Sequence, residues 1–473
     1  MHKPPGINDV RVPFTDASET RVNGWRVSPD GRGTMDILWT CIVTTFLCTF
    51  TILCLNLPSR NDSSVRIQGR KILWMAIAIA GPEFLLTAAA GQLAAARDSV
   101  KAFHALGHTS WTYRHGFFAN MGGFELQPLN GTPFPVNSKH ILWLMSRGHI
   151  RYPEISNEEL LDKSKKDTVS KLITCFQVGY LIVQCIARGV QNLPVTTIEL
   201  STMAIVVCSI MTSICWISKP QDVRYPVRIK MPVTMDQVLR EAGPVAARPY
   251  RQTPLDFVDD LTPSWALNIQ PFIKLPVGPY ERPLPRIGDS RLPWLETLES
   301  LYLCIATMIY ASIHLTGWNF KFPSQVEQIL WRVSSLILVG TTALFWVLET
   351  GAIWQRYGSG HKLWKKMFGS EDKSGVLVTV TEDAAELEAG QVEPRAVEPS
   401  MLESQQPVVE KEEEPWAPKQ LPLVWEFWTI FPVAFIYAMA RLYILVEPIV
   451  GLRSMQAGAF QTVDWMAFLP HVG

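Results

Sequence analysis

Uncharged apolar runs alternate with polar, proline-rich stretches along this chain, and the runs have the length of membrane spans. About 20 mainly apolar residues are needed to cross a hydrocarbon core roughly 30 Å thick. Seven segments approach or reach that length: residues 37–57, 72–96, 172–187, 193–218, 301–318, 333–348 and 421–450. The pattern predicts an all-α fold, a polytopic membrane helix bundle with about seven transmembrane helices, long Pro-rich loops and an acidic disordered linker.

The same pattern divides the chain into eight parts. Charged, proline-rich stretches and apolar runs set their limits. The expected parts are a polar N-terminal tail (1–33), transmembrane helices 1–2 (34–96), a loop with an interfacial helix and a capped amphipathic helix (97–171), transmembrane helices 3–4 (172–218), a Pro-rich membrane-facing loop (219–296), transmembrane helices 5–6 (297–349), a basic then acidic disordered linker (350–420), and transmembrane helix 7 with a C-terminal tail (421–473).

Composition supports a membrane protein. Of the 473 residues 48% are hydrophobic, and 17 are Trp. All eight cysteines fall inside the apolar runs and no C-x-x-C occurs, which favours buried packing residues over a disulfide framework or a zinc site. The first 33 residues lack an apolar core, so we expect no cleavable signal peptide and expect the first span to direct targeting.

Charge placement bears on orientation. Lys and Arg near span ends favour the cytosol, and the loops after spans two, four and six are basic, which predicts a cytosolic N-terminus. The short loop after span one, with Arg60, Arg66, Arg70 and Lys71, conflicts with that layout. Two N-glycosylation sequons begin at Asn61 and Asn130; they lie on opposite sides if span two crosses fully, so at most one can be glycosylated.

The loop after the second span holds two helix signals. The stretch WTYRHGFFANMGGF spaces Tyr113, Phe117, Met121 and Phe124 at helical intervals, which predicts an interfacial helix with its Trp and Tyr at the headgroup level. In the functional alternative, Arg114 and His115 meet a lipid-soluble substrate at the membrane surface. Further on, Ser156-Asn-Glu-Glu forms a capping box that opens a helix expected to continue into span three.

Glu83, beside Pro82 inside an apolar run, is the strongest site candidate. A carboxylate within a span is costly and usually faces a cavity or a partner. It therefore has either a catalytic or transport role, or a packing role in which it pairs with Arg441 in the last span. Further polar candidates lie in spans or at their ends, where long side chains can reach water: Glu199, His314, Glu426, Arg441 and Glu447.

Familiar enzyme motifs do not occur in this sequence. The zinc-protease, nucleophile-elbow, P-loop and dinucleotide patterns are all missing, so we expect no cofactor and no metal site. Asp256, Asp259 and Asp260 resemble a diphosphate-binding cluster, but Pro254 and Pro263 crowd the segment. The basic clusters are charge-paired and adjoin apolar runs, and we expect no nucleic-acid partner.

Several stretches together resemble a large, uncharacterised family of multi-pass membrane proteins from filamentous fungi. They are GWRVSPDGRGTMDILWTC at 24–41, HGFFANMGGF at 115–124, DKSKKD at 162–167, and ARLYILVEPIVGLRSM with VDWMAFLPHVG near the C-terminus. The resemblance covers most of the chain outside the acidic linker. Because some family members are associated with secondary-metabolite gene clusters, it implies a role in such a pathway, by analogy alone, and it carries over no catalytic positions.

Three functions stay open from the sequence. The first is a membrane-embedded enzyme or accessory factor that acts on a lipophilic intermediate by cyclisation, hydration or proton transfer, with Glu83, Arg114 and His115 as catalytic groups. The second is a transporter or channel in which Glu83 and Glu426 line the pathway; the third is a non-catalytic receptor or scaffold. Expected partners are the lipid bilayer, a lipophilic small molecule and pathway enzymes, in the endoplasmic reticulum or plasma membrane.

Overall fold

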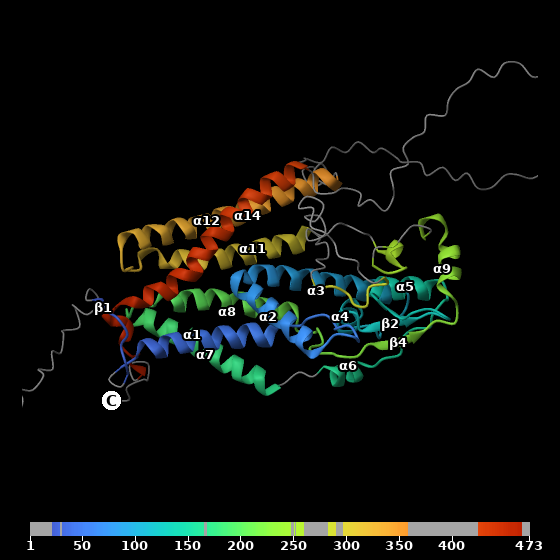
Figure 1. Cartoon of the computed structure of the whole chain (residues 1–473), viewed down its shortest axis with the longest axis horizontal. Coiled ribbons are helices and arrows are strands. Elements are labelled where there is room, and N and C mark those ends of the chain that lie inside the picture. Colours follow the sequence, from blue (N-terminus) through green and yellow to red (C-terminus); the bar gives the residue numbers. More distant parts are fainter. Residues whose placement is uncertain are drawn as a thin grey trace, which may run out of the picture.

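The computed structural model describes residues 21–28, 31–164, 168–246, 250, 252–259, 282–289, 297–357 and 424–465. This part of the chain is mostly helical and forms an elongated bundle with a smaller domain at one end (Figure 1). Six of its helices are long and apolar enough to cross a membrane. They are α1 (Thr34–Ile52), α7 (Thr168–Val190), α8 (Thr197–Cys215), α11 (Thr297–Ile313), α12 (Gln325–Tyr357) and α14 (Val424–Val450).

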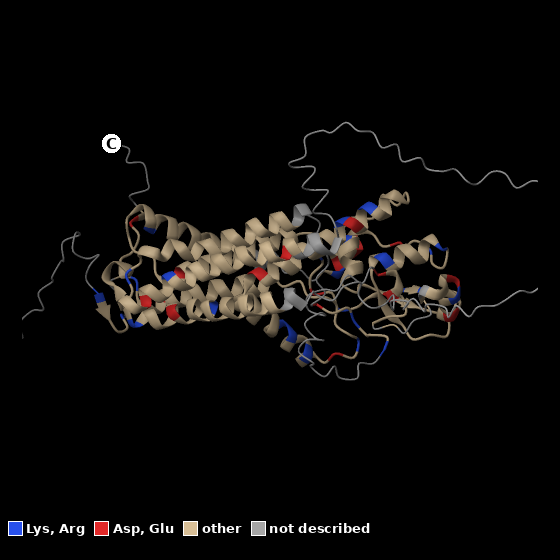
Figure 2. Cartoon of the chain, turned by 90° about the horizontal axis from the view of Figure 1, so that it is seen from above, with Lys and Arg blue, Asp and Glu red and all other residues tan. Residues whose placement is uncertain are grey.

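The outer surface of the bundle is apolar. Charged residues are sparse along its middle and more frequent toward its two ends (Figure 2). Large apolar side chains such as Phe176, Ile186 and Phe435 are exposed, and exposed apolar surface on this scale marks a contact with lipid or with another protein. The six predicted segments that match these helices are confirmed as helices with the length and composition to span a membrane.

The predicted second span, residues 72–96, is not one helix. It is broken into α2 (Ser64–Ala80) and α3 (Pro82–Ala105), which meet at Gly81 with a bend of 112°. Proline lacks an N–H and is favoured at the first position of a helix, and Pro82 occupies that position in α3. A helix that begins there, in a new direction, explains why a continuous apolar run gives two helices.

The α2–α3 pair is a hairpin whose two open ends lie beside the domain (Figure 1). Arg60, shortly before α2, forms an ion pair with Glu125 of the domain at 2.8 Å. Phe103, near the end of α3, is fully buried in the domain core. The hairpin therefore enters the bundle and returns to the same end.

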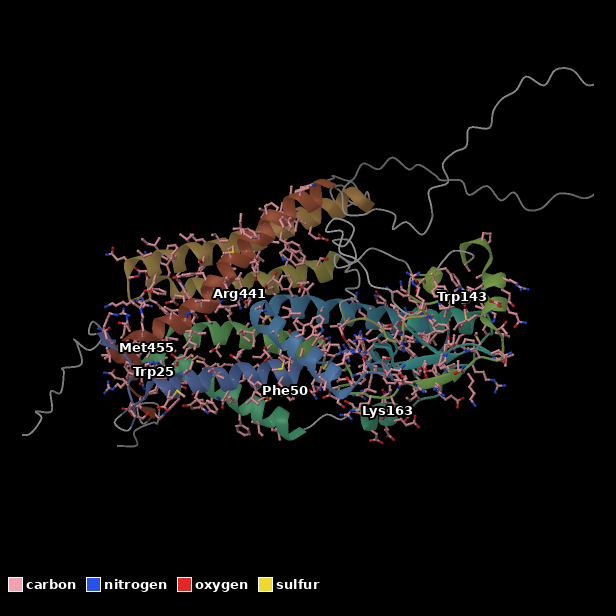
Figure 3. All side chains as sticks on the ribbon, viewed as in Figure 1. Trp25, Phe50, Trp143, Lys163, Arg441 and Met455 are labelled. Atoms are coloured by element: carbon pink, nitrogen blue, oxygen red, sulfur yellow. The ribbon has the colours of Figure 1, made fainter. Side chains whose placement is uncertain are left out.

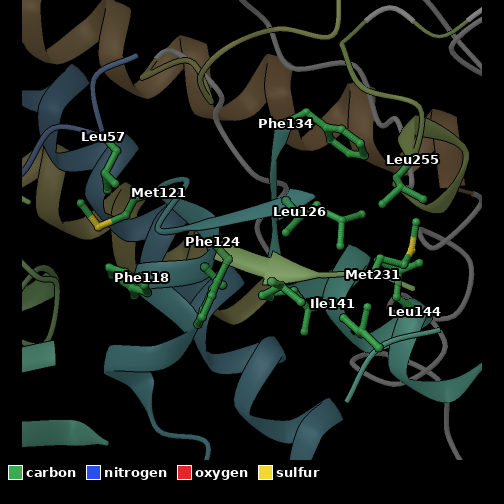
Figure 4. Close-up of a cluster of buried hydrophobic side chains, with 14 of the residues drawn as sticks. Leu57, Phe118, Met121, Phe124, Leu126, Phe134, Ile141, Leu144, Met231 and Leu255 are labelled. Carbon is green, nitrogen blue, oxygen red and sulfur yellow. The ribbon is translucent and has the colours of Figure 1, made fainter. Parts of the chain in front are cut away.

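The domain combines two separate stretches of chain around one apolar core. Its elements are α4 (Tyr113–Asn120), β2 (Phe124–Gln127), β3 (Phe134–Val136), α5 (Ser138–Ser146), α6 (Asn157–Lys163), β4 (Val227–Lys230) and α9 (Met235–Ala242). The strands form a sheet in the order β3-β2-β4, with β4 parallel and β3 antiparallel to β2. Phe124, Leu126 and Ile141 pack at its centre (Figure 4).

This domain corrects two expectations. The all-α assignment omitted the sheet, because its strands have only three or four residues and give no readable alternation. The 219–296 segment was expected to lie on the membrane, yet its described part contributes β4 and α9 to the domain. Residues 260–281 and 290–296 of that segment, and the acidic stretch within 358–423, lie outside the described residues.

The opposite end of the bundle is closed by the two ends of the described chain. β1 (Arg21–Asn23) pairs antiparallel with β5 (Ser454–Gln456). Fully buried Arg188 donates hydrogen bonds to the backbone carbonyls of Pro194, Gly458 and Gln461. These bonds fasten the segment after α14 to the loop between α7 and α8.

Candidate functional site

The hairpin tip leaves backbone groups without helical partners. The last carbonyls of a helix have no intrahelical donor, and α2 ends at Ala80 inside the bundle. Arg441 of α14 supplies donors: its Nε lies 2.9 Å from the Ala80 oxygen and its Nη2 lies 3.3 Å from the Ile79 oxygen. Arg441 is only 4% exposed, and it lies midway along the bundle (Figure 3).

Arg441 also contacts His314, the first residue of a 3₁₀ turn that follows α11. The Arg441 Nη1 is 3.2 Å from the His314 Nε2. The guanidinium lies over the Tyr310 ring, 5.4 Å from its centroid. His314 is fully buried, and its carbonyl accepts a hydrogen bond from the indole of Trp331 at 3.2 Å. Arg441 therefore joins the hairpin tip to α11 and α12.

Glu83, in the first turn of α3, also lies at the hairpin tip. Its Oε1 accepts a short hydrogen bond from the Tyr437 hydroxyl. Its Oε2 is buried and has no hydrogen-bond partner within the described part of the chain. The expected pairing with Arg441 is thus replaced, since Tyr437, one helical turn earlier on α14, holds the carboxylate while Arg441 binds the carbonyls.

Three candidates named from the sequence therefore meet at the hairpin tip: Glu83, His314 and Arg441. We call these residues, with Tyr310 and Tyr437, the tip cluster. Its members come from α3, from α11 with the turn that follows, and from α14. The two tyrosines were missed by sequence reasoning, although Tyr437 lies four residues before Arg441 and hence on the same helical face.

Arg114 and His115 are not part of this cluster, and the interfacial prediction for their segment is wrong. Trp111 is fully buried and stacks on Phe103 at 3.9 Å between ring centroids. His115 is also buried; its Nδ1 lies 2.8 Å from the Thr112 hydroxyl and its Nε2 lies 2.9 Å from the Ile155 carbonyl. Trp111, Phe118 and Phe124 pack into the domain core, and Phe117 packs into the core of the bundle, so these rings face protein rather than a membrane surface.

Burial has the largest effect on the pKa of His115. Removal from water lowers the pKa of the imidazole, the Ile155 carbonyl raises it, and the nearby Arg114 lowers it further. Desolvation is the largest of these effects, so the neutral ring is favoured in the folded domain. The hydrogen bonds of His115 serve the structure of the domain, and its ring is not open to a substrate.

The remaining candidates have separate environments. Glu199 caps α8 through Thr196 and pairs with Arg32 in a buried ion pair. Glu447 is buried near the far end of α14. Glu426 lies in α14, but its side chain is outside the described residues. Glu199 and Glu447 do not join the tip cluster.

The two sequons lie at the same end of the molecule. Asn61 is exposed in the turn before α2, and Asn130 is exposed in the turn between β2 and β3 with φ of 60°. The prediction that they lie on opposite sides assumed a complete second span. In the structure α2 and α3 are two helices bent by 112° and not one continuous span.

Asp256 and Asp259 of the predicted diphosphate cluster have structural partners. Asp256 accepts hydrogen bonds from the Gln252 and Thr253 backbone amides, and Asp259 pairs with His140 at 3.2 Å; Asp260 is outside the described residues.

The Ser156 capping box is confirmed, but its helix ends at Lys163 and does not continue into α7.

Lys219 marks the junction between bundle and domain. Its Nζ donates to the Cys54 carbonyl and to the Gln92 side chain, the latter at 2.7 Å. Burial lowers the pKa of Lys219 to about 8. Sequence reasoning treated this residue only as a basic loop position, because nothing nearby in the chain signals its burial.

The fold and the tip cluster define a helical bundle of the multi-pass membrane type, with a hairpin inserted from the end that carries a small α+β domain. Residues 10–241 match a family described as a family of unknown function (DUF8562). That similarity includes α1, the hairpin, α7, α8 and the domain as far as residue 241, but not the helices that supply His314 and Arg441. No curated protein and no solved structure matches the chain.

Proposed function

We propose that the chain crosses a membrane six times and that the α2–α3 hairpin is re-entrant, in place of a seventh crossing. Both open ends of the hairpin contact the domain, and six other helices have the length and hydropathy of spans. Irregular backbone at membrane depth is tolerated where protein buries it or where it lines a cavity. The capping of the hairpin tip by Arg441 meets that condition.

With six crossings and a re-entrant hairpin, the basic segments all lie on one side of the membrane. Arg60, Arg66, Arg70 and Lys71 now share a side with the basic segments that follow α3 and α8. The conflict that a seven-span arrangement creates disappears. By the positive-inside rule the domain lies in the cytosol. The N-terminal segment then lies on the other side, opposite to the sequence-based expectation.

The function that the geometry supports best is transport of a small solute or ion, with Glu83 as a carboxylate that takes up and releases a proton. One observation carries this proposal: a broken helix brings Glu83, His314 and Arg441 together deep in the bundle. Transporters place binding sites at such helix breaks, and ionisable groups within spans mark pathways and proton relays.

A second candidate is the enzyme or accessory factor on a lipophilic intermediate, in the fungal secondary-metabolite setting that the resemblance implies. The hydrogen bond between the Tyr437 phenol and the Glu83 carboxylate favours it, since such a pair can pass a proton to a bound molecule. Arg114 and His115, which lie in the domain, have no catalytic role in this second candidate function.

Metabolite profiling of cells and medium, measured separately, distinguishes the two candidates. The strains compared lack the gene or carry the natural protein, Glu83→Gln, or Asp98→Asn as a control on an exposed position of α3. Transport predicts an unchanged set of compounds redistributed between cells and medium, in the deletion and in Glu83→Gln. An enzyme predicts a lost product and an accumulated precursor. Normal profiles in a folded Glu83→Gln protein would exclude Glu83 from either role.

A further inference from the structure

A pocket of about 260 Å³ lies at the end of the bundle opposite the domain. It is formed by the start of α8, the segment between α11 and α12, and the chain that follows α14. Apolar side chains form much of its wall: Pro194, Phe320, Phe322, Pro323, Leu452 and Met455. Pockets for drug-sized ligands are usually about 300–1,000 Å³, so this one suits a smaller molecule.

Glu447 is the single acid among the described residues of the pocket wall. The residue is only 4% exposed, and it accepts a hydrogen bond from the Thr197 hydroxyl. Its Oε2 has no hydrogen-bond partner within the described part of the chain, and no ion pair of Glu447 occurs there. A buried carboxylate with an unused oxygen is costly unless a donor or a cation satisfies it.

Cationic side chains near the pocket are directed elsewhere. Arg21 donates to the Phe322 carbonyl at 2.6 Å and to Ser454. Arg453 pairs with Glu327 and caps the Val450 carbonyl. Lys321, the single base among the described residues of the wall, has an exposed side chain. Glu447 therefore has the Thr197 hydroxyl as a partner, and within the described part of the chain no ion pair joins it to Arg21 or Arg453.

We propose that this pocket binds a small organic ammonium ion whose N–H groups donate to Glu447 and whose carbon chain lies against the proline and phenylalanine walls. A charge-assisted hydrogen bond to a carboxylate is stronger than a neutral one, and the apolar wall gains from covering the alkyl part. This inference does not depend on the transport proposal, because it concerns binding at a place separate from the tip cluster.

Thermal unfolding of the purified full-length protein in detergent tests the proposal. The probe is n-butylammonium chloride, with n-butanol as the neutral molecule of the same length and sodium chloride as the ionic control. A ligand that binds only the folded state raises the midpoint as its concentration passes Kd. We expect a saturable rise with n-butylammonium alone. Equal rises with n-butanol, or no rise with any probe, would overturn the proposal.

A substitution assigns the effect to the carboxylate. In Glu447→Gln the apparent Kd for n-butylammonium should increase at least tenfold, about 1.4 kcal/mol, whereas Asp464→Asn at the same end should bind normally. If Glu447→Gln does not fold, Glu447→Asp, which withdraws the carboxylate by one methylene, should weaken binding in the same direction. Unchanged affinity in a folded Glu447 variant would contradict the assignment.

Discussion

Arg441 satisfies three acceptors that would otherwise be isolated from water. Its guanidinium has five donors in a fixed fork, and in this bundle those donors reach the two carbonyls that end α2 and the ring of His314. A lysine in its place would have a single nitrogen on a flexible stem. At the residue scale, then, the hairpin tip depends on the shape of one side chain from a helix more than 350 positions away.

Replacing Arg441 with methionine should destabilise the bundle strongly. The substitution keeps a long apolar stem but leaves the Ile79 and Ala80 carbonyls without donors, and an unsatisfied buried group costs about 1–3 kcal/mol. Thermal unfolding in detergent should show a clearly lower midpoint. Arg453→Met, in the 3₁₀ turn that follows α14, is the control with a half-exposed side chain and should shift the midpoint little. Similar shifts for both would argue against the capping role.

The stability of the domain should decrease in mild acid because of His115. Burial holds the pKa of its folded state below the unfolded value of about 6.5. The unfolded chain therefore takes up a proton that the folded chain resists, and stability is lost as pH falls below about 6.5.

Hydrogen exchange of the domain amides at pH 7 and pH 5 measures this effect. After correction for intrinsic exchange rates, protection should fall at pH 5 in the natural protein and in the control His104→Gln. In His115→Gln the two pH values should give similar protection. If His115→Gln loses as much protection in acid as the natural protein, another group is responsible.

Sequence reasoning located the polar residues but not their partners. Glu83, His314 and Arg441 were visible because charge and imidazole are rare in apolar runs. Tyr437 was not, because tyrosine is common near membranes. His115 was assigned to a surface because its aromatic neighbours look the same whether they face lipid or a protein core; contacts with Phe103 and Ile155, which the pattern does not reveal, make the difference.

At the scale of elements, the hairpin is what most separates the structure from the pattern. The Gly81-Pro82 pair was the available signal, since proline starts helices and glycine accepts unusual backbone angles. Surrounded by apolar residues, it was read as part of one continuous span, because hydropathy alone does not record a change of direction.

Labelling of single cysteines should confirm the hairpin. In a background without the native cysteines, Val65→Cys at the start of α2 and Lys101→Cys near the end of α3 are both exposed. A membrane-impermeant maleimide should reach both from one side of sealed vesicles. Trp25→Cys, at the other end, should react from the opposite side. Labelling of positions 65 and 101 from different sides would show that the pair crosses the membrane.

Close packing of α4 on α3 should make Gly116 intolerant of a side chain. A Cβ there would lie 2.9 Å from the Ala96 carbonyl oxygen, and overpacking typically costs about 1–3 kcal/mol. Gly116→Ala should therefore lower the unfolding midpoint. Gly69→Ala, in α2 with open space around the added atom, should leave it unchanged or raise it, because alanine is the better helix former.

At the scale of the whole molecule, the bundle of six helices has two different ends: one carries the domain, and the other is closed by the β1–β5 pair. The six helices that are long and apolar enough to span a membrane were predictable, since each is a long run with few charges. The domain was not, because its core joins residues 97–164 to residues 219–259 across two helices of the bundle. A short strand such as β4 has no signal until its neighbour β2 is known.

Orientation leads to a prediction about glycosylation. If the domain is cytosolic, Asn61 and Asn130 both lie where oligosaccharyl transfer does not occur, so enzymatic deglycosylation should leave the mass of the protein unchanged. A new sequon placed in the exposed N-terminal segment, for example Val27→Asn with Pro29→Thr, should by contrast add one glycan. Glycosylation of Asn61 or Asn130 would show that the domain lies on the opposite side of the membrane from the one proposed.

The link between Glu83 and Tyr437 spans 354 positions, and this affects biosynthesis. A ribosome adds roughly 5–20 residues per second and the N-terminal parts fold first, so α2 and α3 are made many seconds before α14 exists. During that interval the hairpin tip has neither its arginine nor its tyrosine. The last helix therefore completes the bundle, and a chain that stops short of it would present unpaired carbonyls and a bare carboxylate to the machinery that removes unfinished membrane proteins.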